Sequence, residues 1–172
     1  MSRRTVGRGN LYAEDRKGEH PAAHLAGFQG ILQVDGYSGY KNLLENSPPG
    51  AIRLAFCWAH CRRRFYEIHQ ATGSPLAEEV LRQIRELYAI EADLRGQPAQ
   101  DRRAARQERS RPLVDALHVW LTAQLGRVSG KSNLAEAIRY ALRHWPGWCC
   151  SSTTVGLSWI TTRSSGRSGP LP

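Results

Sequence analysis

One acidic residue, Asp35, lies where the carboxylates of α/β proteins often carry out chemistry. It follows the apolar run Gly30–Val34 and precedes Gly36, a pattern that predicts a buried strand over Ile31–Asp35 with the carboxylate at its C-terminal tip. Open α/β sheets bind ligands and metals at the carboxyl ends of their strands. An Asp-Gly pair is also a favoured turn, and from the pattern alone the turn is the simpler interpretation.

Three successive arginines, Arg62, Arg63 and Arg64, form a second candidate site. They lie near the start of a helix predicted over Trp58–Ala71, directly after a second predicted strand, Ile52–Cys57. Guanidinium groups in this position could contact the phosphates of a nucleic acid. The alternative is a basic helix face that contacts only solvent.

The four cysteines do not make a complete zinc site or a disulfide framework. Cys57 and Cys61, with His60 between them, resemble half a zinc site, but a structural zinc needs four ligands, normally as two separated pairs. The other two, Cys149 and Cys150, are adjacent. In a reducing compartment we therefore expect ordinary buried or half-buried thiols.

The charge of the chain points to a polyanionic partner. A net charge of +9 and a pI near 9.9 make nucleic acid the first candidate. Nearly all of the positive charge is arginine, which a GC-rich genome also favours, so charge alone does not decide the matter. A further basic run, Arg102–Arg111, is diluted by Asp101 and Glu108 and is predicted to be solvated.

Membrane insertion and export are not expected. The longest apolar stretch, Ala51–Ala59, contains Arg53 and is far too short to span a bilayer. No apolar segment follows the charged N-terminus, so the sequence predicts no signal peptide and a cytoplasmic location.

After Ala71 the sequence has the period of helices. They are predicted over Ser74–Leu94, Asp101–Leu125 and Ser132–Trp145, with an interruption at Ser110–Pro112. Apolar side chains at helical spacing are expected in the core: Val80, Leu81, Ile84, Leu87, Tyr88 and Leu94; Leu113, Leu117, Trp120, Leu121 and Leu125; and Leu134, Ile138, Ala141, Leu142 and Trp145. The N-terminal third is thus α/β and the rest helical. From Trp148 onward neither period is visible, which predicts a disordered tail.

Four ordered motifs resemble the insertion sequence 66 family of DDE transposases. They are DRKGEHP at Asp15–Pro21, LQVDGYSGY at Leu32–Tyr40, CWAHCRRRF at Cys57–Phe65 and SNLAEAIRYAL at Ser132–Leu142. The resemblance covers Leu11–Gly147, and the order of the motifs makes it far more specific than any one of them.

The resemblance implies an α/β fold with a partial ribonuclease H-like catalytic core and a helical insertion. Residues 11–71 would form the core and 72–147 the insertion, between a non-native or disordered arm at 1–10 and an aberrant tail at 148–172. Family members cut and join DNA with two divalent metal ions, Mg²⁺ in the intact enzyme, held by an Asp, Asp and Glu trio. Asp35 matches the second of these carboxylates and would be both catalytic and metal-binding, and Arg62–Arg64 would contact DNA.

Two parts of the family pattern are missing. The first Asp belongs upstream of this sequence, and the segment with the catalytic Glu, expected after Gly147, is replaced by a Ser/Thr/Arg-rich tail. With suitable codons, another reading frame of Thr154–Pro170 encodes GRIELDHNTVERAIRP, which is similar to the missing segment. This suggests a frameshift near Trp148.

The sequence therefore predicts a transposase fragment that cannot catalyse alone, because one carboxylate cannot hold two metals. The alternative is a basic DNA-binding or interaction module derived from a transposase, which binds element ends, an intact transposase or other proteins encoded by the element. An independent nuclease would need carboxylates around Asp35 that the sequence does not supply.

Overall fold

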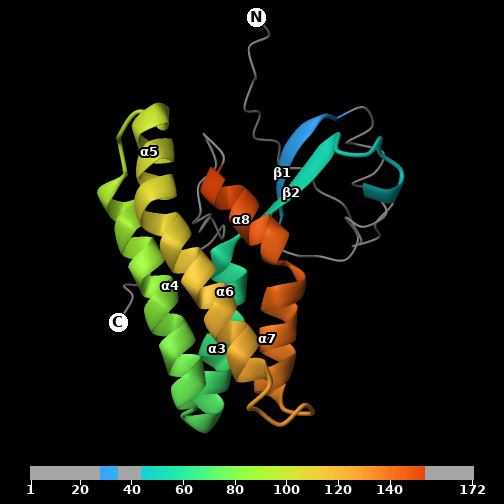
Figure 1. The fold of residues 1–172 in the computed structure, drawn as a ribbon, viewed down its shortest axis with the longest axis vertical. Coiled ribbons are helices and arrows are strands. Elements are labelled where there is room, and N and C mark those ends of the chain that lie inside the picture. The colour runs from blue at the N-terminus through green and yellow to red at the C-terminus, as the bar shows by residue number, and fades with distance from the viewer. Residues whose placement is uncertain (1–27, 35–43, 154–172) are drawn as a thin grey trace, which may run out of the picture.

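The computed structural model describes residues 28–34 and 44–153, apart from the side chains of residue 34 and residues 151–153. Within these ranges the chain forms a small sheet and a larger body of helices (Figure 1). The mixed α/β class is confirmed, with helices predominating. No helix in the described part of the chain is long and apolar enough to cross a membrane.

The sheet consists of two parallel strands, β1 (Gly30–Val34) and β2 (Ile52–Phe56). Their register pairs Ile31 with Arg53 and ends with Val34 opposite Phe56. This confirms that both apolar runs are strands and shows that they pair directly with each other. Asp35, the residue after β1, lies outside the described residues.

The rest of the described chain after β2 is helical, and its last helix packs back against the sheet. The helices are α3 (Trp58–Thr72), α4 (Pro75–Asp93), α5 (Ala99–Ala105), the π-helical turn η1 (Arg106–Ser110), α6 (Arg111–Leu125), α7 (Asn133–Arg143) and α8 (Trp145–Thr153). Helices α3, α4, α6 and α7 form an up-and-down bundle in which α3 and α6 each pack against both α4 and α7 (Figure 1). Helix α8 lies across one end of this bundle and packs on β2.

Side-chain caps begin two of these helices where the sequence predicts them. The Ser74 hydroxyl accepts a hydrogen bond from the Ala77 amide at 3.3 Å, and the Ser132 hydroxyl accepts one from Ala135 at 3.1 Å. Gly73 ends α3 in the left-handed region, at φ 62°, where glycine is not strained. These signals place the turns of the bundle.

The core is built largely from the predicted apolar stripes. Fully buried members include Ile84, Leu87, Leu117, Leu121 and Ile138. On α6 the buried face of the helix differs from the predicted apolar stripe. Val114 is buried, whereas the predicted core residues Leu113, Trp120 and Leu125 are half-buried at its flanks.

The prediction of a disordered tail from Trp148 onward is wrong for residues 148–153, which are helical. The sequence predicts that the last helix ends at Pro146-Gly147, but α8 begins at Trp145 and continues to Thr153. Proline is tolerated in the first turn of a helix, where its missing N–H has no partner to lose. Trp148 is completely buried, and its indole N–H donates to the Ala141 carbonyl at 3.0 Å. Residues 154–172 lie outside the described residues.

Candidate nucleic-acid interface

Helix α3 spreads three arginines over its exposed side. Its buried face consists of Trp58, Cys61 and Phe65, so the remaining positions face outward. Successive residues of an α-helix are rotated by about 100°, and the exposed side chains Arg62, Arg63 and Arg64 therefore fan out from the α4 side of the helix to the α7 side. This exposure is required by both interpretations of the segment, phosphate contact and a solvated basic face.

Two of these arginines lie against tyrosine rings. The Arg64 guanidinium carbon is 3.8 Å from the ring centroid of Tyr140 on α7, and that of Arg62 is 5.4 Å from Tyr66. A cation over an aromatic face is attracted by the ring quadrupole. The tyrosines position the guanidinium groups without neutralising their charge. Neither tyrosine was a candidate site residue in the sequence, although the spacing places Tyr66 beside the basic positions of this helix.

Four arginines of α4, η1 and α6 differ from those of α3, because carboxylates pair with them. Arg82 is held between Glu79 and Glu86, Arg109 bonds to Asp93 at 2.8 Å, and Arg111 bonds to Asp115 at 2.8 Å. None of the three α3 arginines has such a partner within residues 28–34 and 44–153. The positive charge of α3 is thus uncompensated, whereas Arg106, Arg109 and Arg111 of the longer basic run are paired.

One member of the longer run is buried, which corrects the prediction that it is solvated. The Arg106 side chain is 1% exposed and binds Glu91 through two bonds of 2.7 Å, from Nε to Oε1 and from Nη2 to Oε2. Arg106 is the first residue of the π-helical turn η1. The sequence predicts an interruption of the helix close to this position. The ion pair of Arg106 with Glu91, fifteen residues earlier in the chain, could not be inferred from local spacing.

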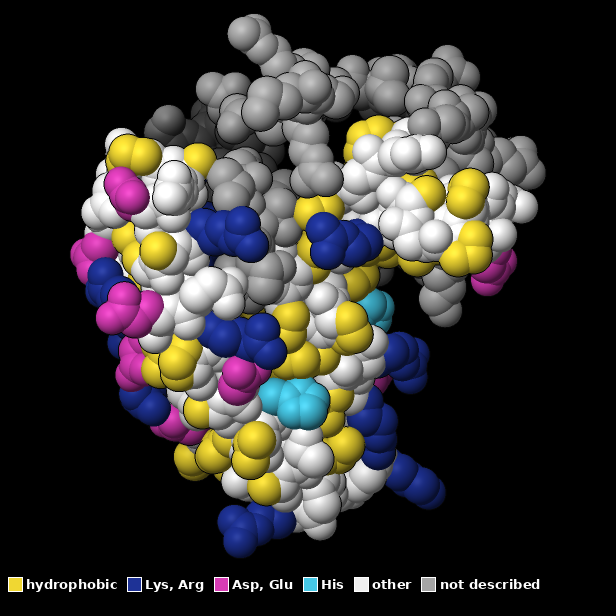
Figure 2. Space-filling model, turned by 45° about the horizontal axis from the view of Figure 1, so that its top comes forward, with side chains coloured by type: hydrophobic (Ala, Val, Ile, Leu, Met, Phe, Trp, Pro, Cys, Tyr) yellow, Lys and Arg dark blue, Asp and Glu magenta, His cyan; other side chains and the backbone are white. Residues whose placement is uncertain are grey.

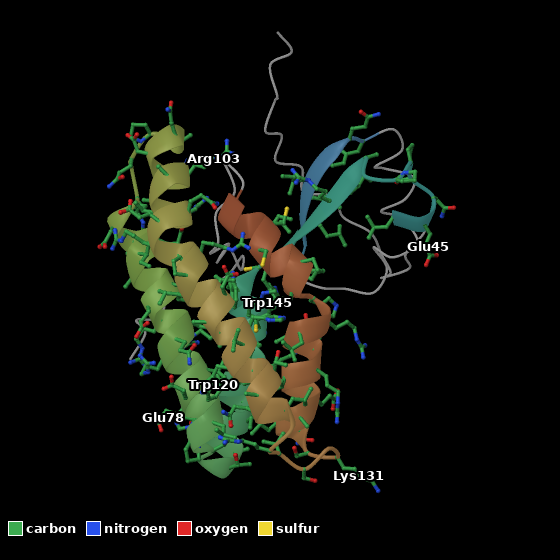
Figure 3. All side chains as sticks on the ribbon, viewed as in Figure 1. Glu45, Glu78, Arg103, Trp120, Lys131 and Trp145 are labelled. Carbon is green, nitrogen blue, oxygen red and sulfur yellow. The ribbon has the colours of Figure 1, made fainter. Side chains whose placement is uncertain are left out.

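Helix α7 and the loop before it extend the positive surface. Arg139 and Arg143 are exposed and four residues apart, so they share one face of α7. Arg139 donates to the Gly130 carbonyl at 2.7 Å, a neutral partner that leaves its charge uncompensated. Lys131 lies at the tip of the loop between α6 and α7 (Figure 3). The basic face defined by Arg62, Arg63, Arg64, Arg139 and Arg143 therefore spans two helices.

The opposite flank of the bundle carries more carboxylates, four of which are paired with arginines. Helix α4 carries five acidic side chains against two arginines, whereas α3 carries three arginines and one glutamate. In Figure 2 the carboxylates gather on the α4 side, and mostly Lys and Arg line the α7 side. Positive and negative charge are thus separated across the bundle.

The described residues do not provide a metal centre. Asp35, the predicted metal-binding carboxylate, lies outside them. In the part of the chain that is described, no three His, Cys, Asp or Glu side chains are grouped so that they could hold a metal ion. These residues alone therefore do not fit the two-metal site that the resemblance implies.

The cysteines are thiols in apolar surroundings, as predicted. Cys57, Cys61 and Cys150 are buried and Cys149 is half-buried, all of them unbridged. Burial raises the pKa of the Cys61 thiol to about 12, against a smaller opposing effect of Arg64. Such a thiol stays protonated and inert at neutral pH.

Comparison with known proteins identifies a family across most of the chain. The model of the family described as "Transposase IS66 family" matches residues 10–154. Two uncharacterized proteins of Sinorhizobium fredii (strain NBRC 101917 / NGR234) are similar. Protein y4jD is 44% identical over 144 residues, which cover 81% of this chain and 28% of y4jD. Protein y4qI is 46% identical over 135 residues, covering 76% of this chain and 25% of y4qI.

The chain thus spans about a quarter of the length of these relatives. No solved structure matches it.

Proposed function

Because the chain belongs to the IS66 family of transposases, we propose that it is a DNA-binding part of a transposase and that its basic face contacts the phosphate backbone. The observation that carries this proposal is the unpaired state of Arg62, Arg63 and Arg64 beside α7. Arginine presents a planar fork of donors that suits phosphate oxygens. Because contacts to phosphate carry no base information, this face would position DNA without selecting its sequence.

The basic face is suited to a polyanion in a second way. The cation–π contacts hold Arg62 and Arg64 near the surface, so these long side chains lose less conformational freedom when they bind than free arginines would. Neutralising several phosphates releases condensed counterions, which makes binding strongly dependent on salt. Affinity and its salt dependence are therefore the quantities to measure.

The test is fluorescence anisotropy of a short labelled duplex over a range of salt concentrations. Arg63→Gln, Arg64→Gln and Arg143→Gln should each weaken binding and reduce the slope of log affinity against log salt by about 0.9 for every phosphate that is no longer neutralised. The matched control is Arg109→Gln, which removes the same charge from an arginine already paired with Asp93. An equal effect of all four substitutions would mean that only net charge matters, and would contradict a defined interface.

We further propose that Asp35 is a catalytic residue only together with other carboxylates that share its metal ions. In the DDE transposases that the motifs resemble, Asp35 would be the second carboxylate for Mg²⁺ in a ribonuclease H-like core, of which β1 and β2 would be a part. The sequence supplies no recognisable partners for Asp35, so these 172 residues by themselves should not cleave or join DNA. Cleavage with Mg²⁺ or Mn²⁺ that is abolished by Asp35→Ala would contradict this proposal.

The family match also bears on the origin of the C-terminal segment. It ends at residue 154, six residues after Trp148, so the frameshift that we propose would lie nearer to residue 154 than to Trp148. Sequencing the coding DNA tests this directly. A single-nucleotide shift should restore the GRIEL…ERAIRP string, and a gene that encodes no such string in any frame would rule the frameshift out.

A further inference from the structure

A groove separate from the centre of the basic face runs between α3 and α4. It has a volume of about 460 Å³, within the range of small-ligand sites. From α3 it is lined by Arg62, Tyr66 and His69, and from α4 by Leu81 and Arg85, among others. The groove thus combines an exposed aromatic ring with guanidinium groups from two helices.

The antiparallel arrangement of α3 and α4 orders these groups along the groove. The helices are joined at Gly73-Ser74, so His69 lies near the closed end, Tyr66 lies one turn farther on, and Arg62 and Arg85 lie beyond it. A flat ring thus lies next to a pair of positive charges contributed by opposite walls.

Tyr66 is available as a stacking surface. Its side chain is an exposed large apolar group, with 42% of the residue accessible. The Arg62 guanidinium lies 5.4 Å from the ring centroid, close to the outer limit of about 6 Å for cation–π contact. The ring can therefore accept a second flat group.

Charge in the groove is uneven. Glu79 is bound by Arg82 and Gln83, and the hydrogen bond from Arg82 is the main reason why its pKa is lowered to about 2. Arg62 and Arg85 have no acidic partner in the described part of the chain. Glu78 also lines the groove (its label in Figure 3 marks it on α4), but it lies seven residues before Arg85 and so about 10 Å from it along the helix, toward the closed end. An anion is therefore favoured at the Arg62–Arg85 end and disfavoured at the other.

We propose that this groove binds a nucleotide unit, with the base stacked on Tyr66 and the phosphate between Arg62 and Arg85. Every base has a π face, so stacking on an aromatic side chain beside a basic groove is the usual chemistry of single-strand binding. A base inside a duplex cannot present that face, so the groove would select single strands or free nucleotides. This inference rests on the proposed role in DNA binding and adds the form of nucleic acid that this part of the protein takes.

The experiment compares two labelled probes on the intact chain, a short thymine-only single strand and a short duplex. Tyr66→Ala should weaken single-strand binding by about tenfold, and Arg85→Gln should weaken it and reduce its salt slope. Tyr66→Phe, which keeps the ring, should bind as the unsubstituted chain does. Duplex binding should change less than twofold in all three. Arg95→Gln, which removes an exposed arginine outside the groove, is the charge-matched control.

Competition by free dAMP shows whether the groove binds free nucleotides or only nucleotides within a strand. If dAMP displaces the strand, the groove takes free nucleotides as well. If dAMP does not compete while binding still depends on Tyr66, the groove is specific for strands. Both results support the proposal.

Single-strand affinity that is unchanged in Tyr66→Ala, or that falls equally in Tyr66→Ala and Arg95→Gln, would overturn the proposal. Duplex binding through Arg63, Arg64 and Arg143 would survive that result. Failure of the groove is therefore distinguishable from failure of the proposed function. Circular dichroism melting of each variant confirms that the substitutions, all at exposed residues, leave the fold intact.

Discussion

Gly147 lies directly against the ring of Phe56. A Cβ atom built on Gly147 would be 1.9 Å from Phe56 Cδ2, far inside any contact distance. This contact joins α8 to β2. The ring of Trp148 also packs against Phe56, with 5.1 Å between the two ring centroids. The attachment of the sheet to the helical body therefore depends on a position with no side chain.

Gly147→Ala should destabilise the protein by about 1–3 kcal/mol or more, because neither the ring nor the helix backbone can move away cheaply. Gly126→Ala is the matched control. Gly126 ends α6 at an ordinary φ of −74°, and its added Cβ would come no closer than 3.8 Å to the Ala123 carbonyl, so this change should be neutral or slightly stabilising. Urea unfolding followed by tryptophan fluorescence measures both. Equal stability of the two variants would contradict the close approach of α8.

Breaking the buried pair of Arg106 and Glu91 should be costly. Glu91→Gln removes the carboxylate that forms two bonds to a guanidinium with 1% exposure, which should lower the free energy of unfolding by about 3–5 kcal/mol. The exposed pair of Arg109 and Asp93, on the same two elements, is the control, and Asp93→Asn should cost less than about 1 kcal/mol. The double substitution Glu91→Leu with Arg106→Met should recover much of the loss. If Glu91→Gln costs no more than Asp93→Asn, the pair is not buried in solution.

Leu117 and Val119 test whether the helices pack as a unit. Leu117 is 1% exposed and Val119 is 69% exposed, two residues apart on α6. Leu117→Ala should cost about 2–5 kcal/mol, through reduced burial and the cavity that remains. Val119→Ala should be neutral or slightly stabilising, because alanine has the higher helix propensity. Chemical denaturation of both variants provides the comparison, and similar midpoints would show that α6 is not packed as described.

Stability should fall in alkali, because burial raises the pKa of Cys61 to about 12 from an ordinary value of 9.0. Between these pH values the unfolded chain loses a proton that the folded chain keeps, so rising pH favours unfolding. The thiol's contribution is fully present below pH 9 and is lost as pH approaches 12. Burial also raises the pKa of Tyr88, which acts in the same direction at higher pH.

Unfolding free energies measured across this window should decline more steeply in the unsubstituted chain than in Cys61→Ala. The difference should be about 1.4 kcal/mol per pH unit, the value for one proton. Cys149→Ala is the comparison, because its half-buried thiol should change the slope less. An unchanged slope in Cys61→Ala would show that this thiol is hydrated in the folded protein.

Local signals in the sequence predicted most of the described framework. Ser74 and Ser132 begin helices because a hydroxyl followed by a helical run satisfies free backbone amides, and that chemistry needs no knowledge of the rest of the fold. The strands were recognisable for a similar reason, since short runs such as Ile52–Phe56 bounded by turn residues are typical of buried strands. The exposure of Arg62–Arg64 also follows from the apolar stripe on the other side of α3.

Features that depend on distant partners were not predictable in this way. Trp148 belongs to a helix because Phe56 and Ala141 provide a pocket and an acceptor for its ring, and neither is visible in the Ser/Thr-rich sequence around it. The burial of Arg106 depends in the same way on Glu91. Tyr66 and Tyr140 were given no binding role, because an aromatic residue at helical spacing is more often part of a core. The catalytic assignment of Asp35 stays a prediction.

The separation of charge between α3 and α4 would also orient the protein during the DNA contact that we propose. A body with arginines on one flank and carboxylates on the other experiences a torque in the field of a polyanion and turns its positive flank forward before contact. Electrostatic steering of this kind acts on the rate of association more than on the lifetime of the complex. Encounters would then be pre-oriented, with α3 and α7 arriving first and the acidic surface of α4 facing away into solvent.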